Sequence, residues 1–486
     1  MSGGIGSLFS SPVNPVNVGL EMFADDMAAQ GANVTRVEWS PPGGGRVEVI
    51  RALDALDQPD VAARIEAANR EAVDRIVSAR PMLVGFDRAI DVVPGMTKTT
   101  LLHSGPPIAW ERMAGAMQGG VTGALVFEGL ARDLDEAAEL AASGDITFSP
   151  CHEHGCVGSM AGVTSASMFM HVVENRTHGN LAYTNLSEQM AKILRMGAND
   201  ESVIARLNWM RDVLGPILSE AMRHAGEIDL RLLLSQALHM GDECHNRNTA
   251  GTALLVQALA PHILKTSFST EDKVAVFDFI ASSDYFSGPT WMVLCKAALD
   301  AAHGIEDSTV VTTMTRNGVE FGIRVSSQPS DRWFTGPAQE VVGPMFAGYK
   351  LEDKGLDIGD SAITETYGLG GFALACAPAI VPMVGGTVEQ AVGYSRAMTE
   401  ITTGENPNVT MPLLDFQGIS TGIDVRKVAA TNVLPVITTA IAHKDAGVGM
   451  IGAGITNPPV ECFHQALVAL ESDIGSTPAP GRAGVA

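Results

Sequence analysis

The chain has 486 residues, of which 46% are hydrophobic and 18% are charged. A chain of this length exceeds the usual size of a single hydrophobic core, so we expect roughly two to four domains. Lys and Arg number 32 and Asp and Glu number 55, which gives a formal net charge of −23. Nucleic-acid binding draws its affinity largely from Lys and Arg on phosphates, so this acidic composition argues against a nucleic-acid partner.

The cysteines and the N-terminal sequence indicate the cellular compartment. Six cysteines are scattered along the chain, and the start, MSGGIGSLFSSPVN, lacks a basic segment followed by an apolar one. We therefore predict a cytoplasmic protein with reduced thiols. No run reaches the roughly 18 to 20 apolar residues of a membrane span, so no membrane association is expected. Residues 471–486 are predicted to form a flexible tail.

Residues 1–145 alternate between strand-like and helix-like segments. The predicted strands are 15–20, 33–41, 81–86, 99–105 and 122–129, and the predicted helices are 21–31, 59–79 and 110–117. This alternation predicts a Rossmann-like, doubly wound parallel sheet. The G-x-G-x-x-G fingerprint is missing after the first strand, where Asn17, Gly19 and Glu21 stand, so no dinucleotide or other cofactor is predicted.

Two further regions complete an α/β multidomain chain. Residues 185–284 carry helix-capping signals, such as Asn199 or Asp200, and predict a helical subdomain. Residues 146–184 and 285–470 are assigned together to an α+β catalytic region with Gly-rich loops. Within that region, an alternating run is interrupted by Asn317-Gly318, which predicts a β-hairpin.

One short stretch contains the densest group of titratable residues. The segment Cys151–Cys156 (CHEHGC) holds two cysteines and two histidines, and Gly158 and Gly162 follow. Such ligands suit Zn²⁺, but adjacent ligands from one short segment strain a tetrahedral site, so no metal is predicted. Either His152 or His154 suits a general acid or base near neutral pH. A cysteine nucleophile and a thiol that packs as a small hydrophobe are the alternatives.

The second polar stretch, GDECHNRN (241–248), lies between two apolar helical runs. Asp242, His245, Asn246 and Arg247 can all contact a small polar ligand, and the guanidinium offers a bidentate fork for a carboxylate or phosphate. An ordinary solvated loop between helices is the alternative reading.

Gly-rich polar loops in the C-terminal half suit an anion, because free amides around glycines can form an anion nest. The candidate positions are Gly370, Gly371, Asp424, Arg426, His443 and Lys444. Each loop taken singly is also consistent with tight packing between strands.

The chain resembles the AllG/YlbE-type family from about Leu8 to Phe463. The resemblance is carried by the motifs VNVGLEMFADDMAAQGANVTRVEWSPPGGG, LLHSGPPIAWERM, CHEHGCVGSMAGVTSASM, MGDECHNRN, GISTGIDVRKV and IAHKDAGVGMIGAG. That family includes a subunit of oxamate carbamoyltransferase. The resemblance implies carbamoyl transfer between oxalurate and phosphate, giving oxamate and carbamoyl phosphate, in purine-ureide (allantoin) catabolism. It also implies separate partner subunits, and we further expect a homo-oligomer.

We therefore predict a carbamoyl-transfer enzyme, or the subunit of one, acting on a small anionic ureide and phosphate. The alternatives are a stand-alone C–N hydrolase of a cyclic or linear ureide or amide, and a non-catalytic binding subunit. The predicted catalytic residues are His154, His245 and His443. The predicted substrate- or anion-binding residues are Asp242, Asn246, Arg247, Gly370, Gly371, Asp424, Arg426, Lys444, Gly158 and Gly162. We expect these residues to line one common crevice, although they are far apart in the sequence.

Overall fold

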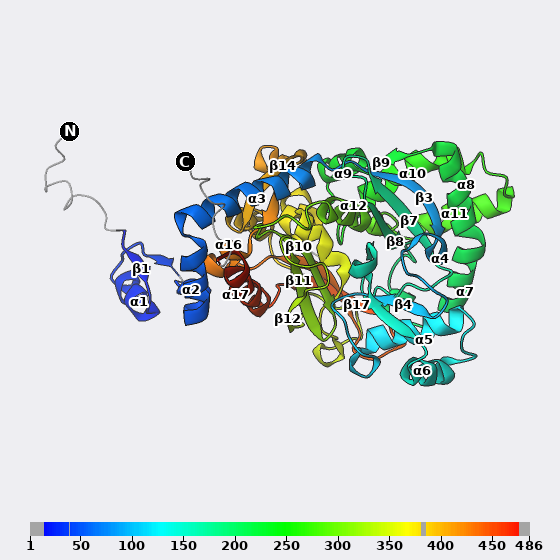
Figure 1. Cartoon of the computed structure of the whole chain (residues 1–486), viewed down its shortest axis with the longest axis horizontal. Coiled ribbons are helices and arrows are strands. Elements are labelled where there is room, and N and C mark those ends of the chain that lie inside the picture. Colours follow the sequence, from blue (N-terminus) through cyan, green and yellow to red (C-terminus); the bar gives the residue numbers. More distant parts are fainter. Residues whose placement is uncertain (1–13, 38, 381–384, 476–486) are drawn as a thin grey trace, which may run out of the picture.

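The structure, a computed structural model, describes residues 14–37, 39–380 and 385–475. Six sheets of two to five strands, together with many helices, make up this part of the chain (Figure 1). The protein is therefore of mixed α/β class, as predicted. No described helix is long and apolar enough to cross a membrane.

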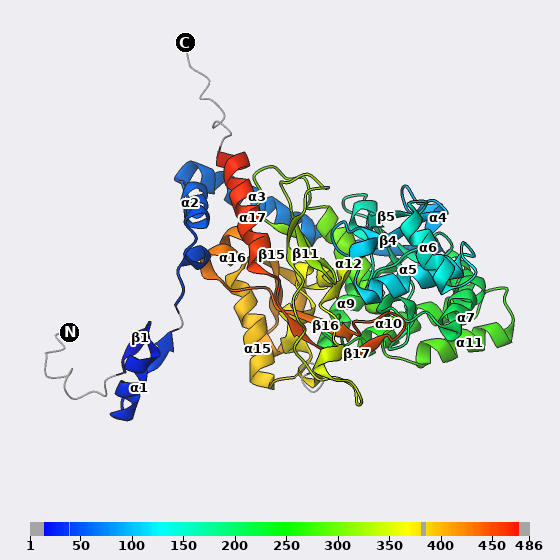
Figure 2. The ribbon, with the colours of Figure 1, turned by 90° about the horizontal axis from the view of Figure 1, so that it is seen from below.

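A small N-terminal unit projects away from the body of the molecule (Figure 2). It consists of β1 (Val16–Val18), α1 (Glu21–Ala29) and β2 (Thr35–Val37), and its two strands pair in parallel. The strand–helix–strand order predicted here is confirmed. Within the described range 14–37, Ala24 is the one buried residue. The exposed apolar side chains of the unit are Val16, Val18, Leu20, Met22, Phe23 and Val37.

The largest sheet has the strand order β6–β8–β7–β3–β9. Its strands are β3 (Pro81–Arg88), β6 (Cys156–Val157), β7 (Phe169–Asn175), β8 (Leu181–Asn185) and β9 (Ile228–Asp229). Strand β7 pairs antiparallel with both β3 and β8. Helix α12 (Gly288–Asp300) contacts β7 and β8, and twelve of its thirteen residues are buried. Its almost uniformly apolar sequence is typical of a helix that is covered on all sides.

The Rossmann-like doubly wound sheet predicted for residues 1–145 is not confirmed. Parallel pairing occurs there only as separate pairs among the described residues, β1–β2 and β4 (Thr100–His103) with β5 (Thr147–Pro150). The segment 122–129, predicted as a strand, falls largely within helix α5 (Gly115–Phe127). Ten of the thirteen residues of α5 are buried, and periodicity alone does not separate a helix that is buried all round from a buried strand.

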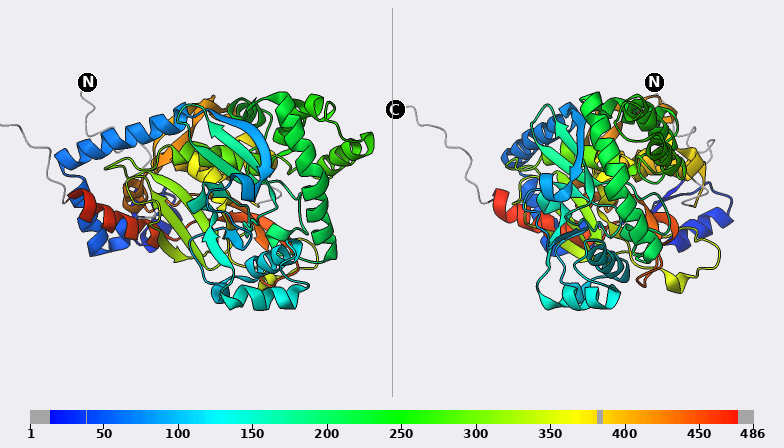
Figure 3. Two further views of the ribbon diagram at one scale, coloured as in Figure 1. Left: turned by 45° about the vertical axis from the view of Figure 1, so that its right-hand side comes forward. Right: turned by 90° about the vertical axis from the view of Figure 1, so that its right-hand side faces the viewer.

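Helices dominate residues 201–281, which lie within the segment 185–284 predicted as a helical subdomain, whereas residues 186–200 contain only the short 3-10 helix 194–196. The helices of residues 201–281 are α7 (Glu201–Trp209), α8 (Gly215–Ala225), α9 (Leu230–His239), α10 (Thr249–Ile263) and α11 (Thr270–Ala281). The side chains of Asp200 and Ser269 accept from backbone amides in the first turns of α7 and α11, so both helices begin at capping residues. Helices α7, α8 and α11, drawn in green, gather at one end of the molecule (Figures 1 and 3).

The C-terminal half contains three antiparallel sheets. Their strands are β10 (Val311–Asn317), β11 (Glu320–Val325), β12 (Phe334–Pro337), β13 (Ile358–Gly359), β14 (Thr402–Met411), β15 (Gln417–Ile423), β16 (Ile437–Ala442) and β17 (Met450–Thr456). The predicted hairpin is confirmed, because β10 and β11 pair antiparallel around Asn317-Gly318.

The other α-helices of the described chain lie in both halves of the sequence. They are α2 (Val47–Leu56), α3 (Pro59–Ser78), α4 (Ala89–Val92), α6 (Leu134–Ser143), α13 (Ile363–Tyr367), α15 (Val388–Ala397), α16 (Val425–Thr431) and α17 (Val460–Gly475). Buried apolar residues form two large cores. One includes residues of the five-stranded sheet, α5 and α12, and the other includes residues of β10, β11, α2 and α17.

Candidate functional site

A small cavity lies where several segments meet that are far apart in the sequence. Its polar lining residues are Ser159, Arg195, His245, Asn246, Tyr285 and Ser361, and its apolar ones are Met160, Met190, Ile193, Met196 and Ala440. The volume of the cavity is about 20 Å³, which is room for about one water molecule. A ligand of several heavy atoms therefore requires some of the flexible methionine side chains to move.

Arg195 brings a buried positive charge to this cavity. Its side chain is 1% exposed, its Nε donates to Glu188 Oε1 at 2.9 Å, and its Nη1 donates to Ser159 Oγ at 2.5 Å. Glu188 also accepts from the amide of Leu194 at 2.8 Å, so it holds the arginine's backbone segment and guanidinium together. Arg195 Nη2 has no hydrogen-bond partner in the described part of the chain. Because an unpaired buried donor is costly, this amino group suits an acceptor oxygen of an anion.

His245 lines the same cavity and rests on a buried carboxylate. Its Nδ1 lies 2.8 Å from Glu365 Oε1 and 3.0 Å from Oε2. An ionised carboxylate only accepts, so Nδ1 carries a proton and donates it to Glu365, which leaves Nε2 as the ring nitrogen that can exchange a proton with a ligand. Burial alone would raise the pKa of Glu365, but its interaction with His245 and the amide of Gly371 lower that pKa below the ordinary value. This is the arrangement of a general base held by a carboxylate.

Asn246 adds a second unpaired donor, because its buried Nδ2 has no hydrogen-bond partner among the residues that the structure describes. The backbone around the cavity is also unusual. Positive φ angles occur at Met160 (53°), Gln189 (73°), Ala191 (70°) and Cys244 (62°). Such conformations cost non-glycine residues on the order of 1–3 kcal/mol each and concentrate at functional sites.

Gly370 and Gly371, predicted as anion-binding amides, lie beside this cavity and bind acceptors of the protein itself. The amide of Gly371 donates to Glu365 Oε1 at 3.0 Å, and the amide of Gly370 donates to the carbonyl of Glu243 at 2.9 Å. A Cβ at Gly370 would come within 2.0 Å of Glu365 Oε1. These glycines therefore let the chain close around the carboxylate that holds His245.

Asp242 and Arg247 belong to the same loop as His245 but contact neighbouring backbone. Asp242 Oδ2 accepts from the amide of Gly251 at 2.8 Å, and Arg247 Nε donates to the carbonyl of Gly241 at 3.0 Å. Neither side chain is among those that line the cavity. They shape the start of α10 and the end of α9.

Gly158 and Gly162 flank Ser159 and Met160 on the loop after β6. The amide of Gly158 donates to Asp360 Oδ2 at 2.9 Å. A Cβ at Gly162 would meet the backbone nitrogen of Ser104 at 2.7 Å, so glycine is required for this close approach. Both glycines thus position the loop that contributes to the cavity wall.

Five predicted residues lie elsewhere: His154, Asp424, Arg426, His443 and Lys444. His154 bonds a carbonyl and a serine hydroxyl at the end of β5. Asp424 caps α16 and binds Arg426 at 2.8 Å. His443 and Lys444 line a separate pocket beside the start of α5. The expected convergence of all motifs on one crevice is therefore only partial.

The Cys151–Cys156 stretch does not provide a reactive thiol. Both cysteines are fully buried, and burial raises the pKa of each thiol. A thiol kept protonated is a poor nucleophile. The described residues contain no group of three or more His, Cys, Asp or Glu that could hold a metal ion.

Five residues of the site are not among the predicted site residues: Ser159, Arg195, Tyr285, Ser361 and the supporting Glu365. Ser159 lies within the motif CHEHGCVGSMAGVTSASM, whereas Arg195 and Tyr285 lie in none of the motifs. For two of them a signal exists. A lone arginine stands between Leu194 and Met196, and a lone glutamate stands between Thr364 and Thr366 just before the Gly-rich loop. A single charge within an apolar or hydroxyl-rich run is unusual unless it has a buried partner.

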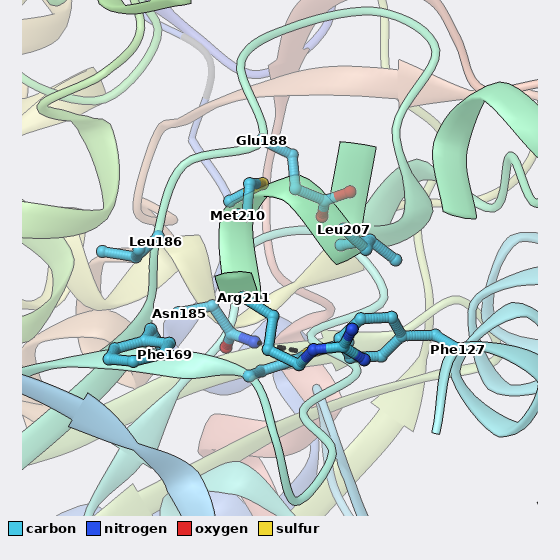
Figure 4. A pocket seen from close by; sticks show the side chains of 9 residues that line it. Phe127, Phe169, Asn185, Leu186, Glu188, Leu207, Met210 and Arg211 are labelled. Atoms are coloured by element: carbon cyan, nitrogen blue, oxygen red, sulfur yellow. Dashed lines mark hydrogen bonds between the residues drawn. The ribbon is translucent and has the colours of Figure 1, made fainter. Parts of the chain in front are cut away.

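A second cavity lies near the first, with Glu188 on its wall (Figure 4). Its other lining residues are mainly apolar, including Phe127, Phe169 and Leu207. Arg211 also lines it, but that guanidinium is bound to Asp212 at 2.7 Å. The unpaired donors and the histidine both belong to the first cavity, so we assign the chemistry there.

The cavity combines the unpaired donors of Arg195 and Asn246 with a histidine that is hydrogen-bonded to a buried carboxylate. Residues 146–361 match the sequence model of a family described as "Oxamate carbamoyltransferase subunit AllG". The chain is 45% identical over 414 residues to the Escherichia coli K12 protein of that description, covering 85% of this chain and 99% of the relative. The chain belongs to the AllG family.

Two further relatives have no stated activity. The Escherichia coli K12 "Uncharacterized protein YahG" is 70% identical over 462 residues, covering 95% of this chain and 98% of the relative. A crystal structure of "a conserved protein of unknown function" from Enterococcus faecalis V583 is 67% identical, with a TM-score of 0.84, covering 84% of this chain and 98% of that one.

Proposed function

We propose that this protein is the substrate-binding and catalytic subunit of a cytoplasmic assembly that transfers a carbamoyl group between a small ureide carboxylate and phosphate. The observation that carries the proposal is the pair of buried unpaired donors, Arg195 Nη2 and Asn246 Nδ2, in the cavity of His245. Membership in the AllG family supports the reaction class, since the named relative is a subunit of an oxamate carbamoyltransferase.

In this proposal the substrate carboxylate accepts from Arg195 and Asn246, which places the carbamoyl group towards His245. Phosphate attacks the carbamoyl carbon, and the bond from that carbon to the amide nitrogen breaks. His245 Nε2 takes the proton of the attacking phosphate and returns it to the departing nitrogen, which leaves as the amide of oxamate. Glu365 fixes the tautomer and stabilises the transient imidazolium. No covalent intermediate is needed.

The test uses the purified protein with its partner subunits, oxalurate and phosphate. We expect oxamate and carbamoyl phosphate to form, and a His245→Gln variant to lower turnover by a factor on the order of 10² to 10⁴. Turnover that persists without phosphate would identify a C–N hydrolase instead. Undiminished turnover in His245→Gln would leave this chain a binding subunit whose chemistry resides on a partner.

A further inference from the structure

We propose that Glu243 is the positioning residue of the site, which sets the loop conformation that presents His245 and Asn246 to the substrate. This role rests on the proposed function, because it concerns the same cavity. The carboxylate does not line the cavity, so it acts through its neighbours.

The loop wraps around the Glu243 side chain. Its Oε2 accepts from the amide of His245 at 3.0 Å, and its Oε1 accepts from the amides of Asn246 and Arg247 at 2.5 and 2.7 Å. Three successive backbone amides that converge on one acceptor form a nest of the kind that binds anions. Here the nest is filled by a fully buried carboxylate of the loop itself.

The fold of the loop depends on this nest. Cys244, which lies between Glu243 and the first amide donor, has a φ of 62°, a backbone conformation that is strained for a non-glycine residue. The amide of Cys244 donates to the carbonyl of Arg247 at 3.2 Å, which closes the turn. The three bonds to Glu243 offset this strain, and without them the amides would be buried and unpaired.

Glu243 also ties the histidine to its supporting carboxylate. Its own carbonyl accepts from the amide of Gly370, and the next amide in the chain, that of Gly371, donates to Glu365. One residue thus clamps the loop that carries His245 to the loop that wraps Glu365. A residue that only stabilised its own loop would hold one segment in place. Glu243 instead sets the position of His245 relative to Glu365.

The experiment compares amide hydrogen exchange and turnover in wild type, Glu243→Gln, Glu243→Asp and a control, Glu220→Gln. In Glu243→Gln one acceptor oxygen becomes an amide donor that faces a backbone N–H. We expect exchange in the 244–248 segment to be at least about tenfold faster and kcat per folded molecule to fall on the order of 10²-fold. Glu243→Asp keeps the charge on a shorter stem and should recover part of both losses. If Glu243→Gln does not fold, the same comparison is made with Glu243→Asp.

The control carboxylate also accepts from a backbone amide, but it is partly exposed and neither it nor its partner lines the cavity. Glu220 Oε1 accepts from the amide of Ser267 at 2.7 Å, so its variant should speed exchange near that serine and leave turnover unchanged. The proposal is overturned if the folded Glu243 variants keep wild-type exchange at 244–248, or if they loosen the loop yet keep wild-type kcat. Amide hydrogen exchange can be measured without enzymatic activity. If the wild-type protein shows no carbamoyl transfer, the proposed function is wrong, and the exchange measurement still tests the role of Glu243 in the loop.

Discussion

Each unpaired donor of a buried guanidinium costs stability, and two of the three side-chain nitrogens of Arg195 have partners within the protein. Glu188 and Ser159 fix two of its nitrogens, and that preorganisation leaves Nη2 aimed for a ligand. Removing the whole side chain would leave the buried carboxylate of Glu188 without its partner, which would lower the free energy of unfolding by several kcal/mol. A change that keeps the charge is therefore the informative one.

Arg195→Lys should weaken oxamate binding about 10- to 100-fold, because one ammonium group cannot serve Glu188, Ser159 and an anion in fork geometry. Isothermal titration calorimetry measures the effect. Arg426→Lys is the matched control, since that guanidinium binds Asp424 and Glu66 away from the cavity and its variant should keep wild-type affinity. Equal affinity in Arg195→Lys and wild type would contradict the assignment.

Asp360 makes a pH-dependent contribution to stability. Burial raises its pKa from 3.8 to about 6. Between those two pH values the folded state holds a proton that the unfolded state releases, so this contribution is lost as pH rises through the window. Relative to Asp360→Asn, wild type should therefore lose up to about 3 kcal/mol of unfolding free energy from pH 4 to pH 7. Urea unfolding of both proteins at each pH measures this, and a difference independent of pH would refute it.

The candidate site could be predicted in part at the scale of single residues. His245 and Asn246 carry titratable or amide groups in a dense polar motif, and such a motif is visible in the sequence. The glycine amides at 370 and 371 were expected to bind a substrate anion, but in the structure the amide of Gly371 donates to Glu365 and the amide of Gly370 donates to the carbonyl of Glu243. Arg195 has no motif around it, since its role depends on a partner and a cavity that only the folded chain creates.

At the scale of elements, the loop that carries Arg195 depends on the glycine-rich face of α5. Helix α5 contacts η5 (Leu194–Met196) closely, because Gly119, Gly120 and Gly123 present no side chain there. A Cβ at Gly119 would meet the carbonyl oxygen of Gly197 at 2.2 Å. The backbone of the arginine's segment therefore sits directly against the backbone of the helix.

Gly119→Ala should lower the free energy of unfolding by about 1–3 kcal/mol, because the clash is with backbone that cannot rotate away. It should also weaken oxamate binding by displacing Arg195. The control is Gly393→Ala in α15, where a Cβ would meet no heavy atom of the described chain within 4 Å. This substitution should raise the free energy of unfolding by about 0.5–1 kcal/mol. Chemical denaturation measures both, and equal effects of the two substitutions would count against the close approach.

Local signals predicted elements better than they predicted sheets. The cap at Asp200 and the turn at Asn317-Gly318 act within a few residues, and both features are observed. Strand pairing depends on partners far along the chain, so the alternation of strands and helices in residues 1–145 did not reveal that β3 pairs antiparallel with β7. Uniformly apolar segments such as α5 carry no periodicity that separates helix from strand.

At the scale of the whole molecule, the N-terminal unit stands apart from the two cores. Its strands are three residues long, and an isolated pair of strands with one helix is marginally stable in water. The chain first attaches to the body just after this unit, where Asn432 of the body donates to Ser40 and to the carbonyl of Pro41. The cavity and both cores lie within the body.

Removal of residues 1–39 should therefore leave the melting temperature of the body within about 2 °C of wild type, since the deleted range 14–37 buries Ala24 alone among its described residues. Differential scanning calorimetry measures this. A fall of more than about 5 °C would show that the unit stabilises the body. Oxamate affinity should also be unchanged in the shortened protein.

The net charge of −23 opposes the approach of any anion, so the proposed function requires that local groups inside the cavity hold the acid. A crystal structure of the protein with bound oxamate tests that claim most directly. We predict that the oxamate carboxylate lies within hydrogen-bond distance of Arg195 Nη2 and Asn246 Nδ2, with its amide towards His245. Oxamate bound beside His443 and Lys444, with no oxamate in this cavity, would contradict the account.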